Sequence, residues 1–121
     1  MAKKEHKFAC PIGETLGIIA GRWKPEILWH LRDKPMRFNE LRRSIGDVSQ
    51  KMLTQQLREM ERDGLVKRTQ YEEIPPRVEY RLTSLAGSLE PIFTTLVTWS
   101  DQNSNRVLKA QQMYDRKNKS I

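Results

Sequence analysis

Residues 49–66 read SQKMLTQQLREMERDGLV, and their pattern is the most informative one in the chain for its architecture. Leu53, Leu57 and Met60 recur at i, i+4 and i+7, a spacing that places them on one face of a helix. The serine that opens the stretch suits the N-cap of this helix, and the glycine near its end suits the turn after the last helical residue. The stretch therefore predicts an amphipathic helix with one face in a core and a polar face free to bind.

A second short helix is predicted just upstream. Leu41 and Ile45 continue an apolar stripe that begins at Phe38, and Asn39 is a good N-cap. Gly46 supplies a tight turn before the next helix. Two short helices with a tight, glycine-containing connection indicate a helix-turn-helix.

The period of the pattern changes after this pair of helices. Residues 65–71 favour a strand, and Val78, Tyr80 and Leu82 alternate with charged residues, as expected of a hairpin with one buried face. The connection at 72–76 contains two prolines, which stiffen it into a projecting loop. Upstream, 36–38 fits a short strand, and helices are predicted at 12–20 and from Pro25 to about residue 33.

We therefore expect a mainly α fold with a small β-hairpin, in winged helix-turn-helix order. Thr83 is predicted to cap a long helix that reaches about Asn103, with Pro91 as a point where it kinks. Its apolar stripe is broader than one small domain needs and indicates a dimer seam on this helix. The alternative is packing of the stripe against the first helix of the same chain. The candidate interface residues are Leu16, Ile92, Leu96 and Trp99.

Length and composition limit the class of protein. With 121 residues, a net charge of +7 and a pI near 9.8, the chain fits one small basic domain whose partner is a polyanion such as nucleic acid. We expect a flexible arm at 1–9, a DNA-binding and dimerisation domain at 10–103, and a helix or mobile tail at 104–121. The absence of a signal-like or membrane-spanning apolar run predicts a cytoplasmic protein that does not bind membranes.

The candidate DNA-binding residues gather on the predicted helix-turn-helix. Recognition helices read the major groove with their first turns, so Gln50 and its neighbours are expected at base edges and Arg58 at a phosphate. The wing contact is expected at Arg77, because Glu72 and Glu73 repel phosphate. The alternatives are a solvated helix face and a cross-strand charge pattern of Arg77 with Glu79. The full set is Arg37, Arg42, Arg43, Ser49, Gln50, Lys51, Thr54, Gln55, Arg58 and Arg77.

Several segments between Cys10 and Trp99 resemble the HxlR-type winged helix-turn-helix transcriptional regulators, relatives of the MarR-like dimeric repressors. The segments that carry the resemblance are Cys10-Pro11, Gly21-Arg22-Trp23-Lys24, Arg37-Phe38-Asn39-Glu40-Leu41, the stretch at 49–66, and Pro75-Pro76-Arg77-Val78-Glu79-Tyr80-Arg81-Leu82-Thr83.

The resemblance implies a homodimer whose interface is formed by the N- and C-terminal helices and which sets two recognition helices in successive major grooves of a near-palindromic operator. It also implies repression or activation of a few genes, of which repression is expected here. The chain departs from the family pattern in two places. It has Ala20-Gly21-Arg22-Trp23 where relatives have Gly-Gly-Lys-Trp, and it has Gly87 where a glycine is expected near Ala86. Both departures concern the dimer geometry rather than the DNA-binding helix.

Cys10 is the single cysteine, so no disulfide can form within one chain. The resemblance implies a redox or electrophile switch at the Cys-Pro position, and the alternative is a small apolar residue that fills the start of a helix. An oxidant or a small molecule is the expected effector. Two histidines and one cysteine, with no close pair, predict no metal site and no cofactor, and the chain has no recognisable catalytic motif. A winged-helix protein-interaction module without specific DNA binding is the alternative function.

Overall fold

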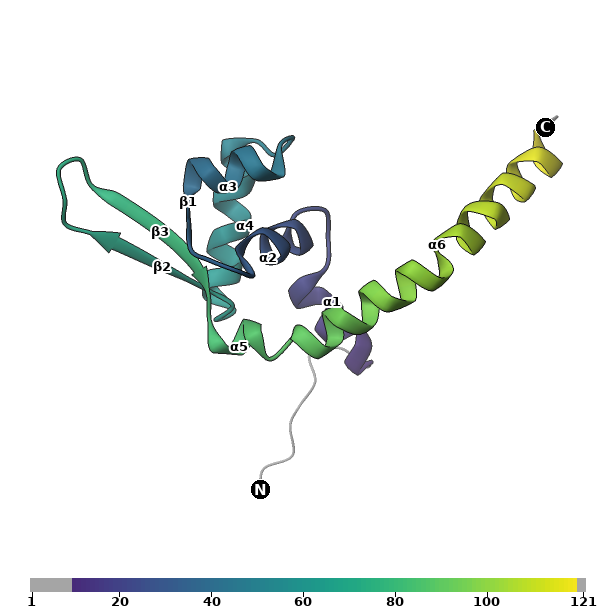
Figure 1. Cartoon of the computed structure of the whole chain (residues 1–121), viewed down its shortest axis with the longest axis horizontal. Helices are drawn as coiled ribbons and strands as arrows, with labels where there is room; N and C mark the ends of the chain where they lie inside the picture. Colours follow the sequence, from purple (N-terminus) through teal and green to yellow (C-terminus); the bar gives the residue numbers. More distant parts are fainter. Residues whose placement is uncertain (1–9, 120–121) are drawn as a thin grey trace, which may run out of the picture. The chain divides into compact units, whose positions relative to one another are not determined.

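The computed structural model describes residues 10–119, and its contacts divide the chain into two units with a boundary between Gly87 and Ser88. The expected arm at 1–9 lies outside the described residues. Within the described residues, the first unit contains five helices and three strands, and the second is one long helix (Figure 1). The elements of the first unit are α1 (Pro11–Ile19), α2 (Lys24–Leu31), β1 (Met36–Arg37), α3 (Phe38–Ile45), α4 (Gln50–Arg62), β2 (Val66–Tyr71), β3 (Arg77–Leu82) and α5 (Ser84–Gly87).

The core of the first unit lies between α2, α3, α4 and the sheet. Ile27, Leu41, Leu53 and Met60 are fully buried, so each of the three helices presents an apolar face to the others. The predicted apolar face of α4 is confirmed, because Leu57 is buried as well. Burial of side chains of this size supplies most of the stability of such a small unit.

The turn between α3 and α4 follows the predicted pattern. Gly46 ends α3 with a φ of +98°, a left-handed conformation that residues with a side chain rarely adopt. The Ser49 hydroxyl then accepts a hydrogen bond from the backbone N–H of Met52 at 3.0 Å and caps α4. Val48 between them is buried and fastens the turn to the core.

The start of α3 differs from the prediction. The N-cap is Arg37 and not Asn39, which lies inside the helix. The Glu40 carboxylate accepts the Arg37 backbone N–H at 3.1 Å, so the first turn is closed by an acidic residue three positions along. Arg37 also belongs to β1, where it pairs with Glu79, and this pairing forces the helix to begin at the next residue.

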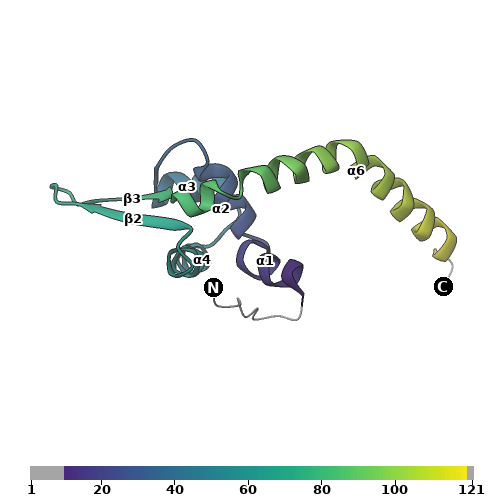
Figure 2. The ribbon, with the colours of Figure 1, turned by 90° about the horizontal axis from the view of Figure 1, so that it is seen from below.

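The sheet is antiparallel and has the strand order β1-β3-β2. The expected hairpin is present, and the short strand predicted at 36–38 adds to its β3 edge through pairing of Met36 with Tyr80. Buried Val66 pairs with Leu82, and the residues that follow Val66 pair in register as far as Tyr71 with Arg77. Figure 2 shows α4 nearly end-on beside the base of the hairpin, where it contacts β2.

Two interruptions change the predicted C-terminal helix. Thr83 caps a helix as expected, since its hydroxyl accepts the Ala86 backbone N–H at 3.2 Å, but that helix is the short α5. A second helix, α6 (Glu90–Asn118), starts after the break with Pro91 in its first turn. Proline lacks an N–H and its ring would collide with the carbonyl of Gly87, so a continuous helix is broken there rather than kinked.

Helix α6 also runs further than the expected end near Asn103. It continues to Asn118, so residues 104–118 are the second half of the helix and not a mobile tail. This half contains no glycine or proline, and it contains two lysines, two arginines and two glutamines, which favour helix. None of the helices in residues 10–119 combines the length and the apolar character that a membrane span requires.

Candidate nucleic-acid interface

The exposed face of α4 forms a shallow groove opposite the buried face. Its side chains come from the first three turns of the helix, where the N-terminal cap has ordered the backbone. The groove is lined by Gln50, Lys51, Thr54, Gln55, Arg58 and Glu59. The structure thus brings the five predicted base and phosphate contacts of α4 onto one surface, while Ser49 serves the helix as its cap.

One of the groove residues has part of its bonding capacity in use. The Thr54 hydroxyl donates to the Gln50 carbonyl at 2.8 Å, which leaves its oxygen lone pairs and its methyl group for a ligand. Lys51, Gln55 and Arg58 are exposed. An amide and two cations side by side can accept and donate hydrogen bonds to base edges and neutralise phosphates.

Two contacts from other elements hold α4 in place. The Arg42 Nε atom on α3 donates to the Val48 carbonyl at 3.1 Å and fixes the turn that precedes α4. The Lys24 Nζ atom on α2 lies 3.2 Å from the Glu59 Oε2 atom, with the Lys24 side chain only 12% exposed. The polar face of α4 is therefore oriented by the rest of the unit and not by its own core contacts alone.

The three predicted cations around α3 differ in availability. Arg37 and Arg43 are exposed, and neither side chain forms an ion pair with another residue in the 10–119 range. Arg42 is exposed too, but its Nε atom already holds the turn before α4. A basic surface thus extends from the start of α3 to its last turn, and Arg42 within it also stabilises the turn before α4.

Arg77, the predicted wing contact, has partners within its own hairpin. Its guanidinium lies 3.1 Å from both the Glu73 and the Glu79 carboxylates and stacks over the Tyr71 ring at 4.1 Å. Two carboxylates offset its charge, and the expected pairing of Arg77 with Glu79 is present, but the two residues lie on the same strand, so the pair is not a cross-strand one. Any contact of this arginine with a phosphate must compete with these carboxylates.

Sequence reasoning missed Glu59 and Lys24. Glu59 could have been found, because it follows Lys51 and Gln55 at i+8 and i+4 and so shares their face. Lys24 carries no such signal, because 35 positions separate it from Glu59 and only the packing of α2 on α4 brings them together.

The remaining predicted residues lie on exposed surfaces. Cys10 is exposed at the N-cap of α1. Leu16 on α1 is 49% exposed, and on α6 Leu96 and Trp99 are 54% and 57% exposed. Ile92 is also exposed, and α6 buries none of its residues. Within residues 10–119, histidine, cysteine, aspartate and glutamate form no group of three or more that could hold a metal ion.

Comparison with known proteins decides between the functions that this surface allows. The HxlR-like helix-turn-helix family matches residues 18–108. The chain belongs to this family. The HTH-type transcriptional regulator YdeP of Bacillus subtilis (strain 168) is 44% identical over 102 residues, which span 84% of this chain and 80% of YdeP. The HTH-type transcriptional regulator BH0655 of Halalkalibacterium halodurans is 50% identical over 96 residues, or 78% of this chain and 85% of that protein.

Solved structures of HxlR-like proteins have the same fold. The reduced form of the redox regulator HypR is 44% identical and superposes with a TM-score of 0.77, covering 84% of this chain and 99% of HypR. The winged helix-turn-helix fold is therefore confirmed, and the chain is a DNA-binding transcriptional regulator. The interaction-module alternative loses its support, and these relatives are regulators rather than enzymes.

Proposed function

We propose that this HxlR-family regulator is a cytoplasmic homodimeric repressor that reads a near-palindromic operator with the first three turns of α4. The observation that carries the proposal is the groove on α4, in which five predicted contact residues gather opposite a buried apolar face. In this reading Gln50, Lys51, Thr54 and Gln55 meet base edges, and Arg58 meets a phosphate. Arg37, Arg42 and Arg43 add phosphate contacts from α3.

Selection of duplexes from a random DNA pool tests the DNA-reading step. We expect a two-fold-symmetric motif with half-sites about one helical turn apart. Gln55→Ala should weaken binding to the selected duplex by about 1–3 kcal/mol and relax the preference at one base position. Arg58→Ala should weaken binding to all sequences and reduce the salt dependence. Arg62→Ala, in the last turn of α4, is the matched control, and equal losses in all three variants would refute the assignment.

The homodimer is supported by apolar surface that one chain leaves exposed. On α6, seven residues at i, i+4, i+7, i+11, i+15, i+18 and i+22 form a stripe along one side of the helix. Most of its large apolar members are exposed. The stripe consists of Ile92, Leu96, Trp99, Asn103, Val107, Ala110 and Tyr114. On α1, Ile12 and Leu16 are exposed as well. We propose that a second copy covers these surfaces, because large exposed apolar patches are rare on monomeric proteins.

Sedimentation tests the dimer. The double substitution Leu96→Ala and Trp99→Ala should give monomers at concentrations where the parent is dimeric, with weaker operator binding. Leu108→Ala is the control, because Leu108 is an exposed apolar residue on another side of the same helix. A parent that sediments as a monomer, or a double variant that remains dimeric, would contradict the proposed seam.

We propose that Cys10 senses oxidants. Its support is an exposed thiol at the start of α1, together with its likeness to HypR, a redox regulator with known oxidised and reduced forms. With one cysteine per chain, a disulfide requires two protomers. Two thiols would then be oxidised while a peroxide is reduced to water, changing the spacing of the recognition helices.

Peroxide treatment of parent and Cys10→Ser proteins tests this step. We expect equal operator binding when both are reduced, and a response to peroxide only in the parent, reversed by dithiothreitol. A reducible dimer band on a denaturing gel identifies the disulfide. If this band is absent and peroxide still changes operator binding of the parent, the thiol carries an adduct instead of a disulfide. If both proteins respond alike, the thiol has a structural task only.

A further inference from the structure

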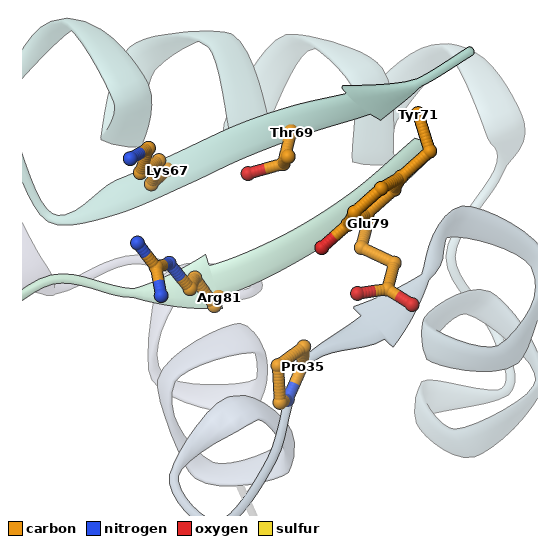
Figure 3. A pocket seen from close by; sticks show the side chains of 6 residues that line it. All are labelled: Pro35, Lys67, Thr69, Tyr71, Glu79 and Arg81. Atoms are coloured by element: carbon orange, nitrogen blue, oxygen red, sulfur yellow. The ribbon is translucent and has the colours of Figure 1, made fainter. Parts of the chain in front are cut away.

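The sheet has an open face with a small depression that no predicted contact occupies. Figure 3 shows its side chains rising from β2 and β3, with a proline from the segment before β1 at its edge. The depression is lined by Pro35, Lys67, Thr69, Tyr71, Glu79 and Arg81. Its volume is about 170 Å³. The lining residues of β2 are every second residue, so they share one face of the strand.

The charges in the depression are unbalanced. Lys67 and Arg81 are direct cross-strand partners, and neither side chain forms an ion pair or a hydrogen bond with another side chain in the described part of the chain. Like charges at directly opposite positions destabilise a sheet. A pair of cations placed this way is stabilised when an anion bridges them.

Glu79 does not supply that anion. Its carboxylate lies 3.1 Å from the Arg77 guanidinium, which is the nearer partner. Arg77 in turn stacks on the Tyr71 ring. At this end of the depression the charged groups are therefore paired with one another, whereas Lys67 and Arg81 at the other end are available to a ligand. Figure 3 shows the Lys67 and Arg81 nitrogens next to each other at that open end, with the Thr69 and Tyr71 hydroxyl groups on the same face.

We propose that the depression binds an oxyanion, a carboxylate or phosphate group, between Lys67 and Arg81. Ammonium and guanidinium groups form charge-assisted hydrogen bonds with such oxygens, and the Thr69 hydroxyl can donate a further bond. The volume lies below the roughly 300–1,000 Å³ that is usual for drug-sized ligands, so a free ligand here is a small molecule. The oxyanion belongs either to such a molecule or to a DNA phosphate.

The location gives this site a route to regulation. Lys67 follows Val66 at the base of the hairpin, and the preceding Leu65 donates its backbone N–H to the Met60 carbonyl of α4 at 2.9 Å. The Thr83 hydroxyl beyond β3 donates to the Gly64 carbonyl at 2.6 Å. An anion that joins β2 to β3 thus stiffens the attachment of the hairpin to α4. This effect on operator binding rests on the proposed function, whereas the binding of the anion does not.

Amide chemical shifts of the full-length protein test the site without DNA. Inorganic phosphate and benzoate are titrated separately, with chloride holding the ionic strength constant. We expect saturable shifts confined to β2 and β3. The double variant Lys67→Gln and Arg81→Gln should bind about a hundredfold more weakly or not at all, because each lost charged hydrogen bond weakens binding about tenfold. Arg68→Gln is the matched control, since it removes one exposed cation from the other face of β2.

A second experiment, which measures binding to the selected duplex, identifies the source of the oxyanion. Saturation by phosphate or benzoate identifies a free anion. If neither anion saturates, the double variant is compared with Arg68→Gln for binding to the duplex. A larger loss of affinity in the double variant, together with a decrease of about two in the slope of log affinity against log salt concentration, identifies a DNA phosphate. If neither anion saturates and the double variant binds the duplex like Arg68→Gln, the site is refuted. Failure of the α4 variants to alter DNA binding would refute the proposed function alone, because the first arm contains no DNA.

Discussion

The ion pair between Lys24 and Glu59 connects α2 to the DNA-facing surface of α4, and its removal should affect stability and DNA binding in different ways. Lys24→Met leaves the Glu59 carboxylate without its cation at the edge of the groove. Because that carboxylate then repels phosphate, we expect weaker operator binding. Glu59→Gln in the same protein should restore binding, since it removes the unpaired charge.

The magnitude follows from exposure and distance. The Nζ to Oε2 distance is 3.2 Å, and the side chains are 12% and 45% exposed for Lys24 and Glu59. Ion pairs between fully exposed side chains contribute about 0.2–1 kcal/mol. The burial of Lys24 places this pair near the top of that range, at about 1 kcal/mol, while solvent around Glu59 keeps it from being much larger. Glu59→Gln alone costs about 1–3 kcal/mol, because the ammonium group stays largely buried without its partner.

Urea unfolding of the two single variants and the double variant measures this coupling energy. The ion pair of Arg22, two residues before α2, with Glu26 on α2 is the matched control, with its nitrogen and oxygen 3.7 Å apart and its side chains 62% and 40% exposed. Its coupling should stay below about 0.5 kcal/mol. If the coupling of Lys24 with Glu59 is no larger than that of the control, the packing of α2 does not orient α4 through this pair. If Glu59→Gln fails to restore operator binding to Lys24→Met, the electrostatic part of the reasoning is wrong.

Two further substitutions test the ends of α4. Gly64→Ala should destabilise the protein by about 1–2 kcal/mol in thermal unfolding, because Gly64 has a φ of +79° and a new Cβ would lie 3.5 Å from a Leu85 methyl carbon, an ordinary contact distance. Gly87→Ala is its control, since a Cβ there meets nothing within 4 Å; an equal loss in both would contradict the backbone argument. Ser49→Ala should lower the free energy of unfolding by about 1 kcal/mol, because it removes the cap of α4. Ser44→Ala is the control and should change it very little, because Ser44 is exposed. Equal urea midpoints for the two variants would rule out a stabilising cap.

The sequence was most informative where structure depends on near neighbours. Ser49, the apolar period of α4 and Gly64 together predicted the start, the buried face and the end of that helix. The hairpin was predictable for the same reason, because alternation and the two prolines of its loop are local signals. All of these features arise from residues within one or two turns, or from adjacent strands.

Features that depend on distant residues were not predictable in this way. Asn39 is a better N-cap than Arg37 by residue type, but pairing of Arg37 with Glu79 in the sheet decides where α3 begins. The partner of Lys24 depends on how α2 packs on α4. The break before α6 is an intermediate case, because Pro91 is visible in the sequence and predicts a kink, whereas the structure has two separate helices there.

The arginines show what this difference means for function. Periodicity placed Arg58, Arg42 and Arg77 on the surfaces expected to face DNA, and it treated each as an available positive charge. In the folded protein the three differ. Arg58 lines the groove, Arg42 holds the turn before α4, and Arg77 lies between two carboxylates. An arginine that keeps its internal partners releases fewer counterions when DNA binds. The salt dependence of operator binding should therefore follow the arginines that lack such partners, and Arg58→Ala should reduce it more than Arg77→Ala.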